Sequence, residues 1–93
     1  MEDDAAVGNL LALSSGFKVE ASDGLVGVVE TPLFPPDQTM PDFLVLRVGG
    51  RHPRHPILAV ALVESVDTNG RVVHVRGLRD EILRFPEHLP LAI

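Results

Sequence analysis

The chain contains no cysteine, tryptophan or tyrosine, and only one lysine. The missing cysteines exclude disulfide bonds, thiolate nucleophiles and cysteine-based zinc sites together. Four phenylalanines are the entire aromatic complement, which leaves little of the stacking surface that proteins use to hold single-stranded nucleic acid. No apolar run approaches the roughly 18 residues of a membrane-spanning helix, and the acidic start at residues 1–4 lacks the positive charge of a signal peptide. We therefore expect a cytoplasmic protein without membrane insertion.

Length and composition predict one small domain. A chain of 93 residues fits a single domain, and hydrophobic residues make up 45% of it, which suffices for an aliphatic core. Residues 1–9 are small and acidic, so we expect them to be frayed. Residues 10–93 are expected to form the domain.

Charge is distributed unevenly along the chain. Residues 1–42 carry eight acidic residues and one basic residue, whereas residues 43–93 carry seven arginines and five acidic residues. The guanidinium group of arginine suits fixed, bidentate contacts with carboxylate or phosphate better than an ammonium group does. The second half of the chain is therefore where an acidic partner is to be sought.

Short runs rich in β-branched residues, separated by turn signals, predict a strand-rich domain. Asp23-Gly24 and Asn69-Gly70 each stand where a two-residue hairpin turn is expected, since such turns need positive φ. Gly27 interrupts one of the runs and suggests a bulge or a close approach of backbone. The predicted strands cover residues 17–21, 25–31, 43–48, 57–63 and 71–76.

Two short segments carry helical signals. Leu78, Ile82 and Phe85 fall at positions i, i+4 and i+7, on one face of a short C-terminal helix that Pro86 would end. Residues 10–13 are apolar and are expected to form either a helical turn or a first strand.

A loop at residues 32–41 contains four prolines and therefore cannot belong to a central strand. Its large apolar side chains either fold back as a lid on the core or form an adhesive surface. The strand that follows is largely apolar on both faces, which indicates that its second face meets something else. We predict that this region mediates self-association as a homodimer, through Leu33, Phe34, Met40, Phe43 and Val45.

The order of these features resembles the PRC-barrel family over residues 10–86. The resemblance rests on Gly16-Phe17-Lys18-Val19, Ser22-Asp23-Gly24, residues 43–50 with their terminal Gly pair, and Asn69-Gly70-Arg71. This family includes the cytoplasmic domain of the photosynthetic reaction-centre H subunit and the C-terminal domain of a ribosome-maturation factor. The resemblance implies an all-β fold, a six-stranded, partly open barrel, and a non-catalytic adaptor that binds other macromolecules.

A second loop contains arginines and histidines within nine residues that include no acid. Such a cluster suits a carboxylate-rich protein surface or phosphate, and nucleic acid only weakly, because the chain as a whole is acidic. Arg51 and Arg54 alternate with the two histidines and would repel a metal cation. The predicted partner-binding residues are Arg47, Arg51, His52, Arg54 and His55.

Nothing in the chain indicates catalysis. Ser14 and Ser15 lack the context of an activated nucleophile, and Gly49-Gly50 is not followed by the Lys of a phosphate loop. We therefore predict no catalytic, cofactor or metal site, and a module that self-associates or docks a protein partner. Two alternatives stay open: an RNA- or ribosome-associated adaptor that uses residues 47–55, and a small-ligand or metal-binding protein.

Overall fold

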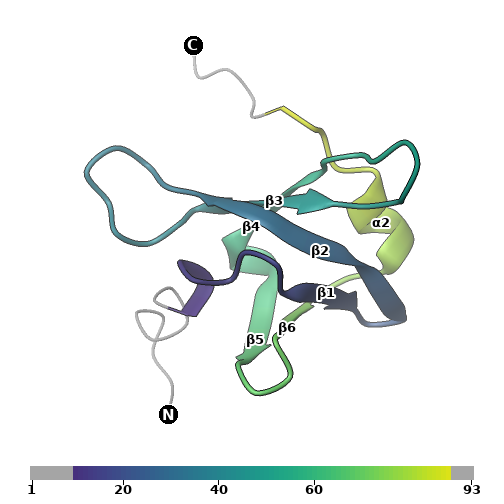
Figure 1. The fold of residues 1–93 in the computed structure, drawn as a ribbon, viewed down its shortest axis with the longest axis horizontal. Helices are drawn as coiled ribbons and strands as arrows, with labels where there is room; N and C mark the ends of the chain where they lie inside the picture. The colour runs from purple at the N-terminus through teal and green to yellow at the C-terminus, as the bar shows by residue number, and fades with distance from the viewer. Residues whose placement is uncertain (1–9, 89–93) are drawn as a thin grey trace.

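The computed structural model describes residues 10–88, which form one six-stranded mixed sheet and a short helix (Figure 1). The predicted fraying of residues 1–9 and the end of the predicted domain at residues 89–93 lie outside the described residues. Across the sheet the strands run in the order β4-β3-β2-β1-β6-β5. The elements are β1 (Lys18–Ala21), β2 (Gly24–Leu33), β3 (Phe43–Arg47), β4 (Ile57–Ala59), the 3₁₀ helix η1 (Val60–Leu62), β5 (Val63–Asp67), β6 (Val72–Val75) and α2 (Arg79–Leu83).

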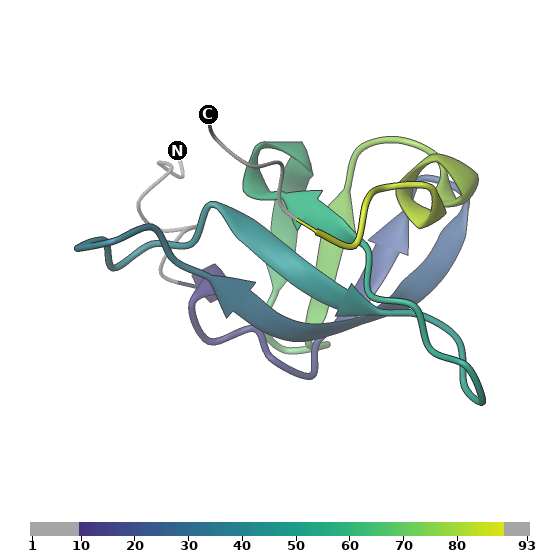
Figure 2. The ribbon, with the colours of Figure 1, turned by 90° about the horizontal axis from the view of Figure 1, so that it is seen from above.

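Neighbouring strands are antiparallel except for β1 and β6, which are parallel. The sheet is curled (Figure 2) but not closed, since no ladder joins β4 to β5 within residues 10–88. The short helix η1 connects these two edges. Val60 N–H donates to the Asp42 carbonyl at 2.9 Å, and Arg76 N–H donates to the Leu62 carbonyl at 2.8 Å. The predicted β-rich fold with its short helix is confirmed. The predicted barrel is not confirmed, because the two edge strands of the sheet, β4 and β5, are not hydrogen-bonded to each other.

The apolar run at 57–63 was predicted as one strand, and the structure divides it. Its first three residues form β4, the next three form η1, and Val63 begins β5. No proline or glycine marks this break in the sequence. The break arises because the chain must leave one edge of the curled sheet and join the other, which a single straight strand cannot do.

In both hairpins the loop residues differ from the two that the sequence predicts. Ala21 pairs with Gly24, so the first loop consists of Ser22 and Asp23. In the second hairpin Asp67 pairs with Val72, so the loop has four residues, and the positive φ of 55° falls on Arg71. The carboxylate of Asp67 accepts the Gly70 N–H at 3.0 Å, and this bond supports the longer loop.

The core is aliphatic, as predicted, and lies inside the curl of the sheet. Residues 10–13 form a turn with helical character rather than a strand, and the fully buried Ser14 hydroxyl donates to the Leu11 carbonyl at 2.7 Å. Helix α2 packs against β1 and β2 and buries Ile82. The buried apolar residues are Leu11, Val19, Val26, Val29, Leu44, Leu46, Leu58, Val73, Val75 and Ile82.

Gly27 is the point of closest approach between β2 and the end of β3. A Cβ atom at this position would lie 2.3 Å from the carbonyl oxygen of Arg47 and 3.0 Å from Val48 Cγ2. The register of β1 against β2 also shifts beside it, where Val19 pairs with Gly27 and Glu20 with Leu25. The predicted close backbone approach at Gly27 is therefore confirmed.

Candidate functional site

The two loops predicted to carry function project from opposite ends of β3 (Figures 1 and 2). The loop predicted at 32–41 begins later than expected, because Pro32 and Leu33 belong to β2 and pair with β3. The proline-rich loop, residues 34–42, precedes β3, and the basic loop, residues 48–56, follows it. Since successive antiparallel hairpins turn at alternate ends of a sheet, the topology requires this separation. Five residues of strand separate the loops, which corresponds to roughly 17 Å. The two loops therefore do not form one cluster within a single molecule, although the two predicted residue sets adjoin on β3, where Val45 and Arg47 share the outer face.

The basic loop is a hairpin held by a single bridge. Val48 and Arg54 exchange backbone hydrogen bonds of 2.9 and 2.8 Å. Gly49 takes a φ of 88°, a left-handed conformation that glycine adopts without steric cost. Residues 49–53 form the exposed tip, so Arg51 and His52 are presented to solvent.

Two of the three arginines have acidic partners that are distant in sequence. Arg47 Nε lies 3.5 Å from Glu30 Oε2 on β2, at the position where the β2–β3 register skips a residue. Arg54 Nε lies 3.8 Å from Glu87 Oε2 beyond α2. This stretch contains no acidic residue in the sequence, but the fold places the carboxylates of Glu30 and Glu87 beside it.

Glu87 also binds the backbone of the basic loop. Its Oε1 accepts the His55 N–H at 2.7 Å. This hydrogen bond, followed by the charges of Arg54, His55 and His88, lowers the pKa of Glu87 against a smaller opposing effect of desolvation. The segment after α2 is thereby attached to the end of the basic loop. Within residues 10–88, Arg51 has no carboxylate within ion-pair distance.

The proline-rich loop does not act as a lid. Phe34 and Met40 are 46% and 37% exposed, and no residue between 34 and 40 is buried. Asp42 N–H donates to the Leu33 carbonyl at 3.0 Å and closes the base of the loop. Beside that base lies a small hollow of about 250 Å³ that Leu33, Phe34 and Phe43 help to line.

Four of the predicted self-association residues form an apolar row that reaches the base of this loop: Leu33, Phe34, Phe43 and Val45. On β3, Leu44 and Leu46 are buried, so the alternate residues Phe43 and Val45 lie on the outer face. Phe43 pairs with Leu33 on one side and with Ala59 on the other. All three are only partly buried. Met40, the fifth predicted residue, lies exposed on the loop.

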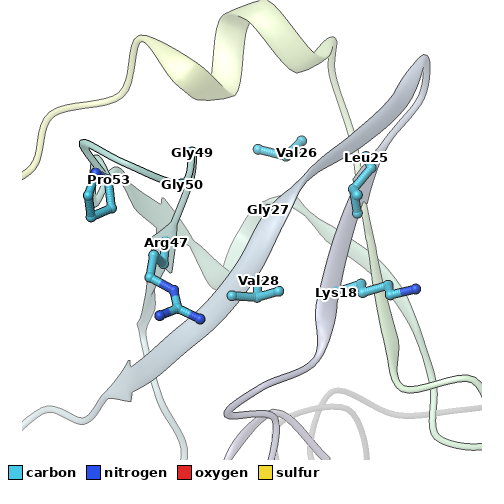
Figure 3. A pocket seen from close by; sticks show the side chains of 9 residues that line it. All are labelled: Lys18, Leu25, Val26, Gly27, Val28, Arg47, Gly49, Gly50 and Pro53. Carbon is cyan, nitrogen blue, oxygen red and sulfur yellow. The ribbon is translucent and has the colours of Figure 1, made fainter.

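Sequence reasoning missed a larger hollow of about 530 Å³, which lies between β2 and the basic loop (Figure 3). Gly27, Val28, Arg47 and Gly49-Gly50 line part of it, and no acidic side chain does. The available signal was Gly49-Gly50, because a missing Cβ can leave open space beside a backbone, as it does at Gly50.

Residues 10–88 lack two further kinds of feature, a cluster of metal-ligating side chains and a long apolar helix. Within residues 10–88, no group of three or more His, Asp or Glu side chains is close enough to hold a metal ion. Over the same residues, no helix has both the length and the apolar character required to cross a membrane.

Comparison of the sequence with models of known protein families gives no match, and comparison with curated protein sequences gives none either.

Proposed function

We propose that this chain is a non-catalytic interaction module of the PRC-barrel type that self-associates as a homodimer. The observation that carries the proposal is the apolar row formed by Leu33, Phe34, Phe43 and Val45, next to a loop that also exposes Met40. Exposed apolar surface of this kind on a small domain marks an interaction site. The resemblance to the PRC-barrel family supports the same role.

A second copy of the chain fits this face because the two loops have opposite charge. The proline-rich loop contains Asp37 and Asp42, with no basic residue between 32 and 42. The basic loop at the other end of β3 contains Arg51, Arg54 and two histidines, with no acid. A two-fold axis near Val45 would place each proline-rich loop beside the partner's basic loop. The predicted self-association and partner-binding residues would then be two halves of one self-complementary interface.

Sedimentation equilibrium at micromolar concentration tests the dimer. We expect a mass of twice 10.1 kDa and association that weakens with added salt, because charge pairs at the rim are screened. The double variant Phe34→Ser, Met40→Ser should be monomeric and folded. Leu13→Ser is the matched control, because Leu13 is 81% exposed outside the proposed interface and its loss should leave association unchanged. A monomeric wild-type chain would refute the proposal.

A charge exchange tests the orientation of the two copies. Asp37→Lys and Arg51→Glu should each weaken self-association, since each places like charges together at both ends of the interface. Mixing the two variants should restore association, because the mixed pair contains only opposite charges at both contacts. If the mixture associates no better than either variant alone, the antiparallel arrangement is wrong.

The second candidate is docking of an acidic protein partner by the basic loop. It is favoured by the exposure of Arg51 and His52 at the loop tip, without a carboxylate on Arg51 among residues 10–88. The carboxylates on Arg47 and Arg54 reduce the charge available to an RNA backbone. In this case Arg51→Glu should abolish capture of a partner while the sedimentation of the purified chain stays unchanged.

A further inference from the structure

The ionisable side chains that line the hollow beside Gly27 are all basic. Its ionisable lining groups are the side chains of Arg47 and Lys18, and it has no acidic lining residue. Within residues 10–88, the N–H groups of Gly49 and Gly50 donate to no backbone or side-chain acceptor. Basic side chains together with backbone donors that lack acceptors suit an anion.

The shape of the hollow supports a ligand rather than a surface ion. Its volume of about 530 Å³ falls within the usual range for small-molecule sites. Three glycines line it, and Gly50 has open space where a Cβ would stand, so a ligand can approach the backbone closely. Val28 and Pro53 add apolar contact area on its walls (Figure 3).

Arg47 is the principal charged group of the hollow. Figure 3 shows its guanidinium group directed toward Val28, whereas the amine of Lys18 extends away from Arg47. The Nε of Arg47 lies 3.5 Å from Glu30 Oε2, and the Arg47 side chain is 55% exposed. The guanidinium group is therefore accessible to a ligand, and Glu30 competes with that ligand for the same positive charge.

We propose that this hollow binds a small organic oxyanion, with its phosphate or carboxylate group on Arg47 and the Gly49 and Gly50 amides, and its apolar part on Val28 and Pro53. The hollow borders the apolar row of the proposed dimer, because Arg47 follows Val45 on the outer face of β3. None of its lining residues belongs to that row, so the assignment does not require self-association. Lys18 can reach the ligand by rotation of its flexible side chain.

Titration of the ¹⁵N-labelled full chain with phenyl phosphate tests the site. We expect the amide signals of Gly27, Gly49 and Gly50 to shift with one common dissociation constant. Phenylacetate distinguishes a carboxylate from a phosphate source, and inorganic phosphate measures the contribution of the apolar part. If none of the three probes shifts these glycine signals, the proposal is wrong.

Two variants should change the affinity in opposite directions. Arg47→Gln should weaken binding of phenyl phosphate about tenfold or more, because a charged hydrogen bond is lost. Glu30→Gln should strengthen it roughly two- to fivefold, because the competitor for an exposed arginine is removed. Arg76→Gln is the control and should leave the dissociation constant unchanged. Equal affinities for wild type and Arg47→Gln, or weaker binding by Glu30→Gln, would overturn the assignment.

Discussion

The side-chain carboxylate of Asp23 accepts a 2.7 Å hydrogen bond from the backbone N–H of Arg79, the first residue of α2. The residue before the helix is Leu78, whose side chain has no acceptor for the N–H groups at the helix start. Glu81 accepts the Leu78 N–H at 2.9 Å, and Arg79 Nε donates to the Leu25 carbonyl at 2.9 Å. The first hairpin therefore supplies the cap that the helix lacks locally.

Removal of this long-range cap should destabilise the fold. Asp23→Ala should lower the free energy of unfolding by about 1 kcal/mol, the usual cost of losing a helix-capping acceptor. Asp23→Asn keeps an acceptor oxygen and should retain most of the stability. Urea denaturation measures both, with Glu64→Ala on the exposed part of β5 as the control. Equal stability of Asp23→Ala and wild type would show that the bond contributes nothing.

A methyl group at Gly27 should be poorly tolerated. The Cβ of Gly27→Ala would meet the Arg47 carbonyl oxygen at 2.3 Å, and this backbone atom cannot move without shifting β3. We expect a loss of about 1–3 kcal/mol or more in the free energy of unfolding, as for overpacked cores. Gly50→Ala is the matched control, because its Cβ meets open space. Equal losses in the two variants, measured by thermal or urea unfolding, would contradict the close approach.

Stability should depend on the ionisation of Glu87. Because the folded state lowers the pKa of this carboxyl group, its contribution is complete above the ordinary glutamate pKa. It is lost as the pH falls through the lowered value. The difference in free energy of unfolding between wild type and Glu87→Gln should thus be present at neutral pH and vanish in acid. Urea unfolding across this pH range measures it.

The variant Arg54→Gln separates the causes of that pKa shift. The largest cause is the hydrogen bond from the His55 backbone, and the charge of Arg54 is a smaller one. NMR titration of the Glu87 carboxyl carbon in Arg54→Gln should therefore still give a lowered pKa, closer to the ordinary value than in wild type. Complete loss of the shift would assign it to Arg54 instead.

Replacement of Arg71 by glycine should preserve or increase the stability of the fold. Its φ of 55° is a left-handed conformation that costs non-glycine residues roughly 1–2 kcal/mol. Arg71→Gly should therefore be as stable as wild type or more stable, and Arg71→Val should be less stable, since β-branched residues fit this region poorly. The melting temperature of Arg71→Gly should equal or exceed that of wild type, and that of Arg71→Val should be lower than wild type. An Arg71→Val variant more stable than wild type would contradict the observed turn.

Local signals in the sequence determined most of the secondary structure and one of the candidate surfaces. Alternating apolar residues place Leu44 and Leu46 inside and Phe43 and Val45 outside, because side chains along a strand alternate between the two faces. The short helix also follows from spacing, since Leu78, Ile82 and Phe85 recur at helical intervals. These features depend on neighbours within a few residues.

Tertiary structure alone decided where the charges and the hollow lie. The basic loop is acid-free in sequence, yet Glu30 and Glu87 approach Arg47 and Arg54 from β2 and from beyond α2. The break of the apolar run at Val60 likewise follows from the need to connect two edges of the curled sheet. Such contacts join residues that are distant along the chain. A local sequence pattern therefore does not predict which segments the completed fold brings together.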